Sequence, residues 1–378
     1  MAQDNISRQK AEKIHNNRFS SMGRRQVLKA LSVAGVGGLS TAYLTSEDVK
    51  AASSDEVPIV YGLKREELGN PKTDLVPMKK NVPADWYNDV QHAEKVRDAL
   101  DLHKNAGVNE VDVRPAKYGG RSSYIEVGVS PELARGNGLV PETAKSAIPE
   151  SHSGVEIKLK EVGVGKMACY TGDYGSTIPG GAVCRSGVGS SGTFSSAMFK
   201  NNNGPYFATN AHLWAGASNP TTSYDMNHNS SNEKVADIIE ANCQLDYALG
   251  DPDNHTPQQK IVAGGEDVTF QYTKSGINDQ IGQGAHGTKR GISSCETSGE
   301  IYTANGYIGA VDKGCPNRGY QVKGEWDIER GDSGSVAFID NGSNVGALSM
   351  NAGFDPLNDN AFGFGAYRLK AQQGLSYA

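Results

Sequence analysis

The stretch ERGDSGS, residues 329–335, runs directly into the apolar strand Val336–Ile339. Glycines on both sides of Ser333 allow the backbone to make a tight turn, and they leave the amides of Gly331 and Ser333 free to point at one spot. A serine hydroxyl is a poor nucleophile at neutral pH unless it is exposed on such a turn beside a base. The sequence therefore predicts a nucleophilic serine here, although a polar β-turn without chemistry also fits this stretch.

The base that such a serine needs is expected upstream, at the end of a β-strand. The stretch YFATNAHLW, residues 206–214, places an apolar strand directly before His212. Three other histidines, His228, His255 and His286, lie among Asn, Asp, Pro and Gly, which is typical of exposed loops. We therefore predict that His212 is the general base; the alternative is a buried histidine with a structural role.

A carboxylate must then hold the imidazole in one tautomer and stabilise its protonated form. The stretch QLDYAL, residues 244–249, places Asp246 inside an alternating apolar strand, where burial is costly without a partner. Asp237, in the similar stretch VADII, is the main competitor. Asp251 and Asp253 lie in a turn that contains proline, so we expect solvent around them. Asp246 is the preferred candidate.

The order His212, Asp246, Ser333 along the chain is that of chymotrypsin-type proteases, unlike that of subtilisins or α/β-hydrolases. The segments ATNAHLW, LDYAL and GDSGS resemble the histidine, aspartate and serine motifs of trypsin-like serine proteases. Residues 346–353, GALSMNAG, resemble the strand that lines the primary specificity pocket in that family. More narrowly, the chain resembles a microbial exported branch in which a small α/β module precedes the barrels.

This resemblance implies a mostly β protein: a double six-stranded β-barrel of the chymotrypsin type, preceded by a small α/β N-terminal domain. It also implies a serine endopeptidase that cleaves protein or peptide substrates through an acyl-enzyme intermediate, without cofactor or metal. His212, Asp246 and Ser333 would form the catalytic triad, and the amides of Gly331 and Ser333 would form the oxyanion hole.

Substrate-binding residues follow from the resemblance alone. Asp327 lies six residues before Ser333, where trypsin-like enzymes carry the acid that selects Lys or Arg; a solvent-exposed acid is the competing interpretation. Ser349 and Asn351 lie on the strand that resembles the pocket wall, and Asn351 stands where pancreatic-type enzymes usually carry glycine. Ser335 replaces the last glycine of the commoner GDSGG, and Asp332 is expected to pair locally.

Composition and charge exclude several classes of protein. Hydrophobic residues make up 37% of the chain and charged residues 21%, which is typical of a globular protein. Residues 1–51 carry a net positive charge, so the remainder is more acidic than the −6 of the whole chain and offers nucleic acid no electrostatic footprint. The cysteines lack paired CxxC spacing, which argues against zinc and favours one or two disulfides with an odd thiol left over. They are Cys169, Cys184, Cys243, Cys295 and Cys315.

The first fifty residues resemble an export signal. Residues 23–29, GRRQVLK, precede an apolar stretch, Ala30–Leu44, that is diluted with Gly and Ser, and small residues follow at Ala51. Twin arginines and a weakly hydrophobic core are typical of a Tat signal rather than a Sec signal. We expect Tat export to an extracellular or cell-surface location. An uncleaved segment would be the one possible membrane anchor, and a chance amphipathic helix is the alternative.

Between this segment and the barrels, the pattern predicts a small α/β unit. Apolar residues recur with a helical period over residues 84–105, and Val111–Val113, Tyr124–Val129 and Val155–Val162 are strand-like. The expected division is therefore a signal segment at 1–51, an α/β domain at 52–165 and a protease domain at 166–378.

Two rival functions remain open. A protease-like binding protein with a silent triad would have the same fold, because fold alone does not decide activity. An esterase fits less well, because the Gly-x-Ser-x-Gly turn between a strand and a helix is missing.

Overall fold

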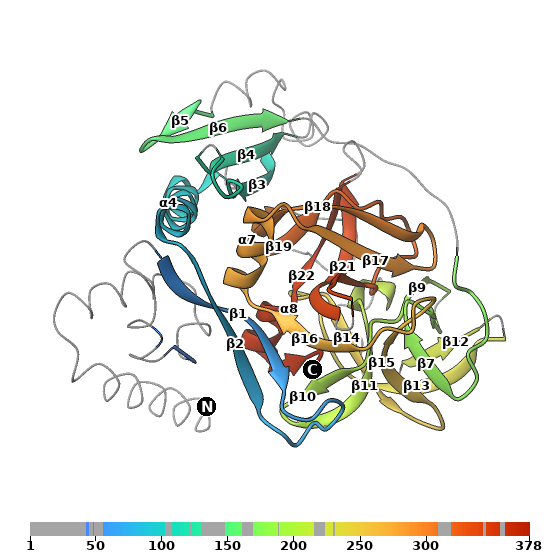
Figure 1. Ribbon diagram of the computed structural model, residues 1–378. Helices are drawn as coiled ribbons and strands as arrows, with labels where there is room; N and C mark the ends of the chain where they lie inside the picture. Colours follow the sequence, from blue (N-terminus) through green and yellow to red (C-terminus); the bar gives the residue numbers. More distant parts are fainter. Residues whose placement is uncertain are drawn as a thin grey trace, which may run out of the picture.

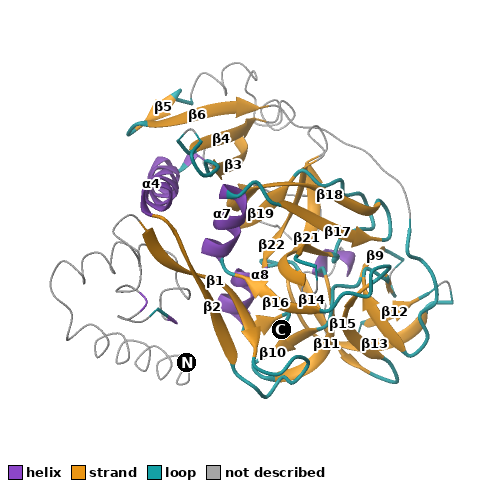
Figure 2. Ribbon diagram, in the orientation of Figure 1, coloured by secondary structure: helices purple, strands orange, loops and turns teal. Residues whose placement is uncertain are grey.

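The computed structural model describes residues 43–44, 48, 56–102, 108–120, 122–129, 148–160, 169–187, 189–214, 224–229, 231–308, 319–342, 345–355 and 360–378 (Figure 1). Strands dominate, and helices are few and short (Figure 2). The prediction of a mostly β, chymotrypsin-like fold is confirmed. Nearly all of the expected signal segment, and Cys315, lie outside the described residues.

The second barrel is a closed ring of six strands. In order around the ring these are β17 (His286–Gly291), β18 (Cys295–Ile308), β19 (Gly319–Gly324), β22 (Asn360–Gly365), β21 (Val345–Asp355) and β20 (Val336–Asp340), which pairs back to β17. Residues 336–339 of the strand that follows Ser333 are all apolar and all buried, so both faces of the strand are covered. Ala337 and Ile339 pack inside the ring, whereas Val336 and Phe338 pack against the first barrel.

The first barrel is a half-barrel in the described part of the chain. Its sheet runs β23 (Leu375–Ser376), β10 (Met198–Lys200), β11 (Asn203–Thr209), β14 (Tyr247–Pro252), β13 (Glu233–Asn242), β12 (Asp225–His228), β8 (Val183–Ser186) and β9 (Ser191–Thr193). β7 (Thr177–Gly180) and β15 (Thr256–Ile261) pair separately. The turn between β10 and β11 is made by Asn201 and Asn202, both with positive φ, as asparagine-rich hairpin turns require.

Residues 56–160 form what we call the N-terminal module. It contains β1 (Glu56–Arg65), β2 (Leu75–Pro83), α4 (Ala84–Leu100), β3 (Val108–Arg114), β4 (Tyr124–Val129), β5 (Ser151–His152) and β6 (Val155–Lys160). The predicted helix and three strands of this region are present. The helix is shorter than expected because Asp101 adopts a left-handed conformation, φ 50°, that ends it. The sequence patterns do not indicate the β1–β2 hairpin.

The module continues the sheet of the second barrel. β1 pairs with β16 (Val268–Tyr272), which in turn pairs with β21, and β3 pairs with β18. α7 (Lys274–Gly282) lies between the module and the barrel (Figure 1). The division at residues 165 and 166 therefore stays a prediction, since the strands on either side of it share one sheet.

The two barrels meet over a shared core. Met198 and Leu249 of the first barrel and Phe338 and Phe364 of the second belong to one buried cluster. α8 (Ala366–Gln373) leads from the second barrel to β23, which pairs with β10 of the first. Among the helices of the described residues, none has the length and apolar character of a membrane span.

Candidate active site

Asp246 and His212 form a close pair at one end of the first barrel. β11 ends at Thr209, and a short 3-10 helix, Ala211–Trp214, follows it and carries His212. The ring Nδ1 of His212 lies 2.6 Å from Asp246 Oδ2, and the backbone amide of His212 donates to Oδ1 at 2.9 Å. The carboxylate is fully buried, whereas the imidazole is 25% exposed. An ionised Asp246 therefore makes Nδ1 the protonated nitrogen and leaves Nε2 as the base.

The turn that presents Asp246 is itself held in place. Asp246 has φ 45°, which a non-glycine residue rarely adopts, so its carboxylate is aimed by a strained backbone. The side-chain amide of Asn210, two residues before His212, donates to the Asp246 carbonyl at 2.6 Å. The strand end that carries the base and the turn that carries the acid are thus joined by three hydrogen bonds.

The environment of His212 tunes its basicity in two opposed ways. Burial alone would lower the pKa of His212, but the negative charge of Asp246 and its hydrogen bond to the ring outweigh burial, so the pKa is raised above 6.5. A base with a raised pKa is neutral, and so able to accept a proton, only at pH values above that pKa.

We expect kcat/KM for a peptide substrate to fall as the pH falls through the raised pKa of His212, because the protonated ring cannot accept the serine proton. The measurement is kcat/KM from pH 5 to 9 with a substrate that has no titrating group in that range. An acid limb centred below pH 6.5 would contradict the dominance of Asp246 over burial. In Asp246→Asn the limb should move to lower pH.

Ser333 lies on a turn docked against the strand end that leads to His212. The Ser333 carbonyl accepts from the Thr193 amide at 2.8 Å, and the Thr193 carbonyl accepts from the Thr209 hydroxyl at 2.8 Å. Gly334, at φ 97°, leaves no room for a side chain, because a Cβ there would lie 2.2 Å from the Thr209 hydroxyl oxygen. Within the described residues, no hydrogen bond joins the Ser333 hydroxyl to the His212 ring.

Two amides of the turn are available to a negatively charged oxygen. Neither the Gly331 nor the Ser333 amide donates a hydrogen bond to any described residue. Gly331 has φ 114°, and its carbonyl is held by the Thr193 hydroxyl at 2.8 Å. A Cβ at Gly331 would lie 2.2 Å from the Ser293 hydroxyl oxygen, so only glycine fits. Preorganised donors of this kind can stabilise a tetrahedral intermediate.

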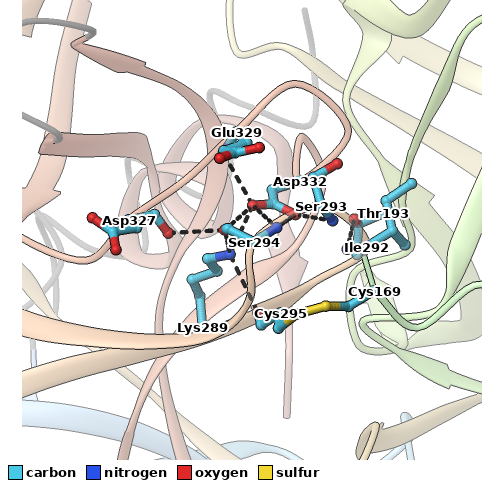
Figure 3. The surroundings of a disulfide bond; sticks show 10 residues. All are labelled: Cys169, Thr193, Lys289, Ile292, Ser293, Ser294, Cys295, Asp327, Glu329 and Asp332. Atoms are coloured by element: carbon cyan, nitrogen blue, oxygen red, sulfur yellow. Dashed lines mark hydrogen bonds and ion pairs between the residues drawn. A yellow bond between two sulfur atoms is a disulfide. The ribbon is translucent and has the colours of Figure 1, made fainter. Parts of the chain in front are cut away.

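Asp332, between these two residues, points into the protein and is neutralised by Lys289 of β17. Lys289 Nζ lies 2.7 Å from Asp332 Oδ2, and both side chains are fully buried (Figure 3). The carboxylate also accepts from the amides of Ser293 and Glu329, at 2.6 and 3.0 Å, and from the amide and hydroxyl of Ser294. Burial lowers the pKa of Lys289, although the facing carboxylate favours its charged form. The pair thus ties the backbone just before Ser333 to the segment that contains Ser293 and Ser294.

Lys289 is a residue of the candidate site that the sequence did not indicate. Residues 286–288 of its strand, HGTKRG, resemble the start of the second barrel in trypsin-like proteins, but nothing there indicates a buried lysine, and a lysine in a strand usually faces solvent. Gly291, two residues after Lys289, leaves room for the Asp332 carboxylate, because a Cβ at Gly291 would lie 2.4 Å from Asp332 Oδ1. The lysine is in turn buried under the segment Ile292–Cys295, whose last carbonyl accepts from its Nζ at 3.3 Å.

A disulfide anchors this segment. Cys295 is bonded to Cys169, 126 residues upstream, with the two Cα atoms 5.0 Å apart (Figure 3). Cys243 is also in a disulfide. Cys184 is a buried free thiol, and burial raises its pKa, which disfavours the reactive thiolate form. The odd thiol expected from the cysteine count is therefore Cys184.

The three candidate substrate-binding residues have different surroundings. Asp327 is exposed, and its carbonyl accepts from Thr297 and Ser294. Ser349 and Asn351 are fully buried between β20 and β22, and the Asn351 amide group donates to Ser335 at 3.0 Å. Ser349 and Asn351 are both 0% exposed, and such burial does not favour direct contact with substrate. All three assignments stay predictions.

The closed six-stranded barrel and the half-barrel beside it are arranged as in chymotrypsin-like folds. The His212–Asp246 pair lies on the half-barrel, and the Ser333 turn precedes a strand of the closed barrel. Within the described residues, no group of three or more His, Cys, Asp or Glu side chains could hold a metal ion.

Comparison with known proteins gives the following findings. No protein-family model matches the sequence, and no curated protein matches it significantly. Among solved structures, the chain is similar to a glutamic acid-specific serine protease that uses a histidine triad in substrate binding, with 18% identity and a TM-score of 0.41 over 52% of this chain and 98% of that one. It is also similar to a chymotrypsin of Cellulomonas bogoriensis (17% identity, TM-score 0.39, 53% and 97%). A third similar structure is protease A of Thermobifida fusca (16% identity, TM-score 0.40, 53% and 97%).

Proposed function

We propose that this protein is a serine endopeptidase that cleaves peptide bonds through an acyl-enzyme intermediate. The observation that carries the proposal is the Asp246–His212 pair, which leaves Nε2 as the base, at the strand end to which the Ser333 turn is tethered through Thr193 and Thr209. His212 would take the Ser333 proton as the hydroxyl attacks the substrate carbonyl, and would return it to the leaving amine. The amides of Gly331 and Ser333 would bind the oxyanion.

A fluorophosphonate probe tests this proposal most directly, because it labels only a serine that a neighbouring base activates. We expect the wild-type protein to be labelled and Ser333→Ala to be unlabelled, with no change in its thermal midpoint. Ser335→Ala, two residues away and fully buried, is the matched control and should keep its label. Absence of wild-type labelling across pH 7–9 would remove the proposal.

A catalytically silent, protease-like binding protein is the second candidate. It is favoured by one observation, the lack of a hydrogen bond between the Ser333 hydroxyl and His212 in the described residues. Catalytic hydrogen bonds are often long in enzymes without substrate and tighten in the complex, so this geometry does not outweigh the paired acid and base. Cleavage of casein separates the two candidates, and a short-chain ester tests the less favoured esterase.

For localisation, we propose export through the Tat pathway and action on extracellular or cell-surface proteins or peptides. The support is the twin-arginine sequence at Arg24 and Arg25 followed by the weakly hydrophobic stretch Ala30–Leu44. Arg24→Lys with Arg25→Lys should retain the protein inside the cell, whereas release by the double variant would contradict this proposal.

A further inference from the structure

Three largely buried charged side chains of the protease half, residues 169–378, lie against the N-terminal module and take their counter-ions from it. The first is Lys323 of β19, which is 1% exposed. Its Nζ lies 2.7 Å from Asp112 and 3.5 Å from Glu110, and both carboxylates belong to β3 of the module and are at most 2% exposed. The lysine thus has two counter-ions, and both come from the module; its Nζ also donates to the Tyr307 carbonyl of β18 at 3.3 Å.

The other two charged side chains, Lys274 and Asp279, lie on α7, and their counter-ions also come from the module. Asp279 has a fully buried side chain and is paired with Lys80 of β2, and it also accepts from the Tyr118 hydroxyl. Lys274, 13% exposed, lies 2.6 Å from Glu94 of α4, which is 8% exposed. Positive and negative charges of the protease half are therefore both neutralised across one boundary.

The backbone crosses the same boundary. Val111 and Glu110 of β3 pair with Tyr307 and Ile308 of β18. On the other side, β1 pairs with β16, and the Thr273 amide donates to the Tyr61 carbonyl at 3.1 Å. The module covers two strand edges that would otherwise present unpaired amides and carbonyls to water (Figure 1).

We propose that the N-terminal module is a permanent folding partner of the second barrel, retained in the mature protein, and not a segment whose removal frees the enzyme. Without it, Lys323 and Asp279 would lose their counter-ions, and β16 and β18 would lose the strands that pair along their edges. Loss of the module would therefore unfold the barrel that presents Ser333. This inference concerns stability and goes beyond the proposed catalytic function.

The position of the module agrees with a supporting role. Its pairing partners are β16 and β18, and its ion pairs go to α7, β18 and β19. Within the described residues, no hydrogen bond or ion pair joins the module to His212 or Ser333. The module is therefore attached mainly to the second barrel; its Arg65 also donates to Ser376 of β23 at 3.2 Å and lies over the Phe199 ring.

The first test uses charge-neutral variants of the full chain, read by thermal unfolding. Glu110→Gln with Asp112→Asn should lower the thermal midpoint by about 10 °C, because Lys323 is left without a counter-ion. Adding Lys323→Met to this pair should recover most of the loss, since the charge that needs a partner is then gone. Glu300→Gln is the matched control: it breaks the exposed Lys117–Glu300 pair across the same boundary and should change the midpoint by less than about 2 °C.

Equal midpoints for wild type and the Glu110/Asp112 double variant would overturn the proposal. So would a triple variant no more stable than the double variant.

A second test keeps the proposal falsifiable if the double variant does not fold. A specific cleavage sequence is placed between residues 160 and 169, and the purified protein is cut. We expect the two pieces to elute together with an unchanged thermal midpoint; separation with unfolding of the larger piece would also support dependence on the module. Release of the module from a larger piece that keeps the parental midpoint would overturn the proposal. Fluorophosphonate labelling, measured in parallel, reports separately on the proposed activity.

Discussion

Replacement of Asp246 by asparagine is expected to lower kcat about 10⁴-fold while the fold stays intact. An amide at this position can still accept from the His212 backbone amide, which the carboxylate binds at 2.9 Å, so the turn should keep its shape. It cannot hold a proton on Nδ1 with a negative charge or stabilise the imidazolium that forms as Ser333 attacks. The variant should therefore bind substrate normally and fail at the chemical step. Steady-state kinetics and a thermal midpoint measured on the same preparation test this.

Asp237→Asn is the matched control. Asp237 is the competing candidate from the sequence, but the structure places it on β13, 56% exposed and paired with Lys234. Its replacement should leave kcat within about twofold of wild type, because an exposed ion pair of this kind contributes little. An equal loss in both variants, or no loss in Asp246→Asn, would show that the acid has been assigned to the wrong residue.

Replacement of Asp332 by asparagine should reduce the free energy of unfolding by about 3–5 kcal/mol, because it leaves Lys289 charged and fully buried. The same change should lower the fraction of active sites that a fluorophosphonate titrates, since the carboxylate also anchors the amides of Ser293, Ser294 and Glu329 around the nucleophile. Urea unfolding gives the stability, and active-site titration gives the fraction.

The Lys289→Met, Asp332→Asn double variant separates charge from geometry. With the lysine gone, the free energy of unfolding should return toward the wild-type value. The turn that carries Ser333 should still be poorly ordered, so the fraction of active sites that a fluorophosphonate labels should stay low. Glu296→Gln, which removes an exposed partner of Arg290 on the same hairpin, is the control and should have little effect. Full activity in Asp332→Asn would contradict a positioning role for this carboxylate.

Much of the fold was predictable because its signals are local. The apolar strand after Ser333, the helix that starts at Ala84 and the strands at Val111 and Tyr124 follow from the spacing of apolar residues alone. The pairing of Asp246 with His212 followed from motif and strand context. In each case a few consecutive residues were enough to predict the element or the pair.

What could not be predicted depends on residues distant in the chain. Lys289 meets Asp332 only because two strands of a closed barrel bring them together, and no feature near Lys289 indicates a buried pair. The partners of Lys323 lie two hundred residues upstream for the same reason; the separation from Asp112 is 211 residues. The burial of Ser349 and Asn351 depends on the two strands that flank β21, so resemblance of a single strand could not reveal it.

The internal Lys289–Asp332 pair has a consequence for how such an enzyme would be switched on. Because the cation that orders the nucleophile turn comes from the interior of the barrel, no newly cut amino terminus has to migrate into the protein to supply it. The enzyme would be active as soon as it is folded, and proteolytic removal of upstream residues would not activate it. Control of activity would then depend on when the protein is synthesised, where it is exported and what binds beside Ser333.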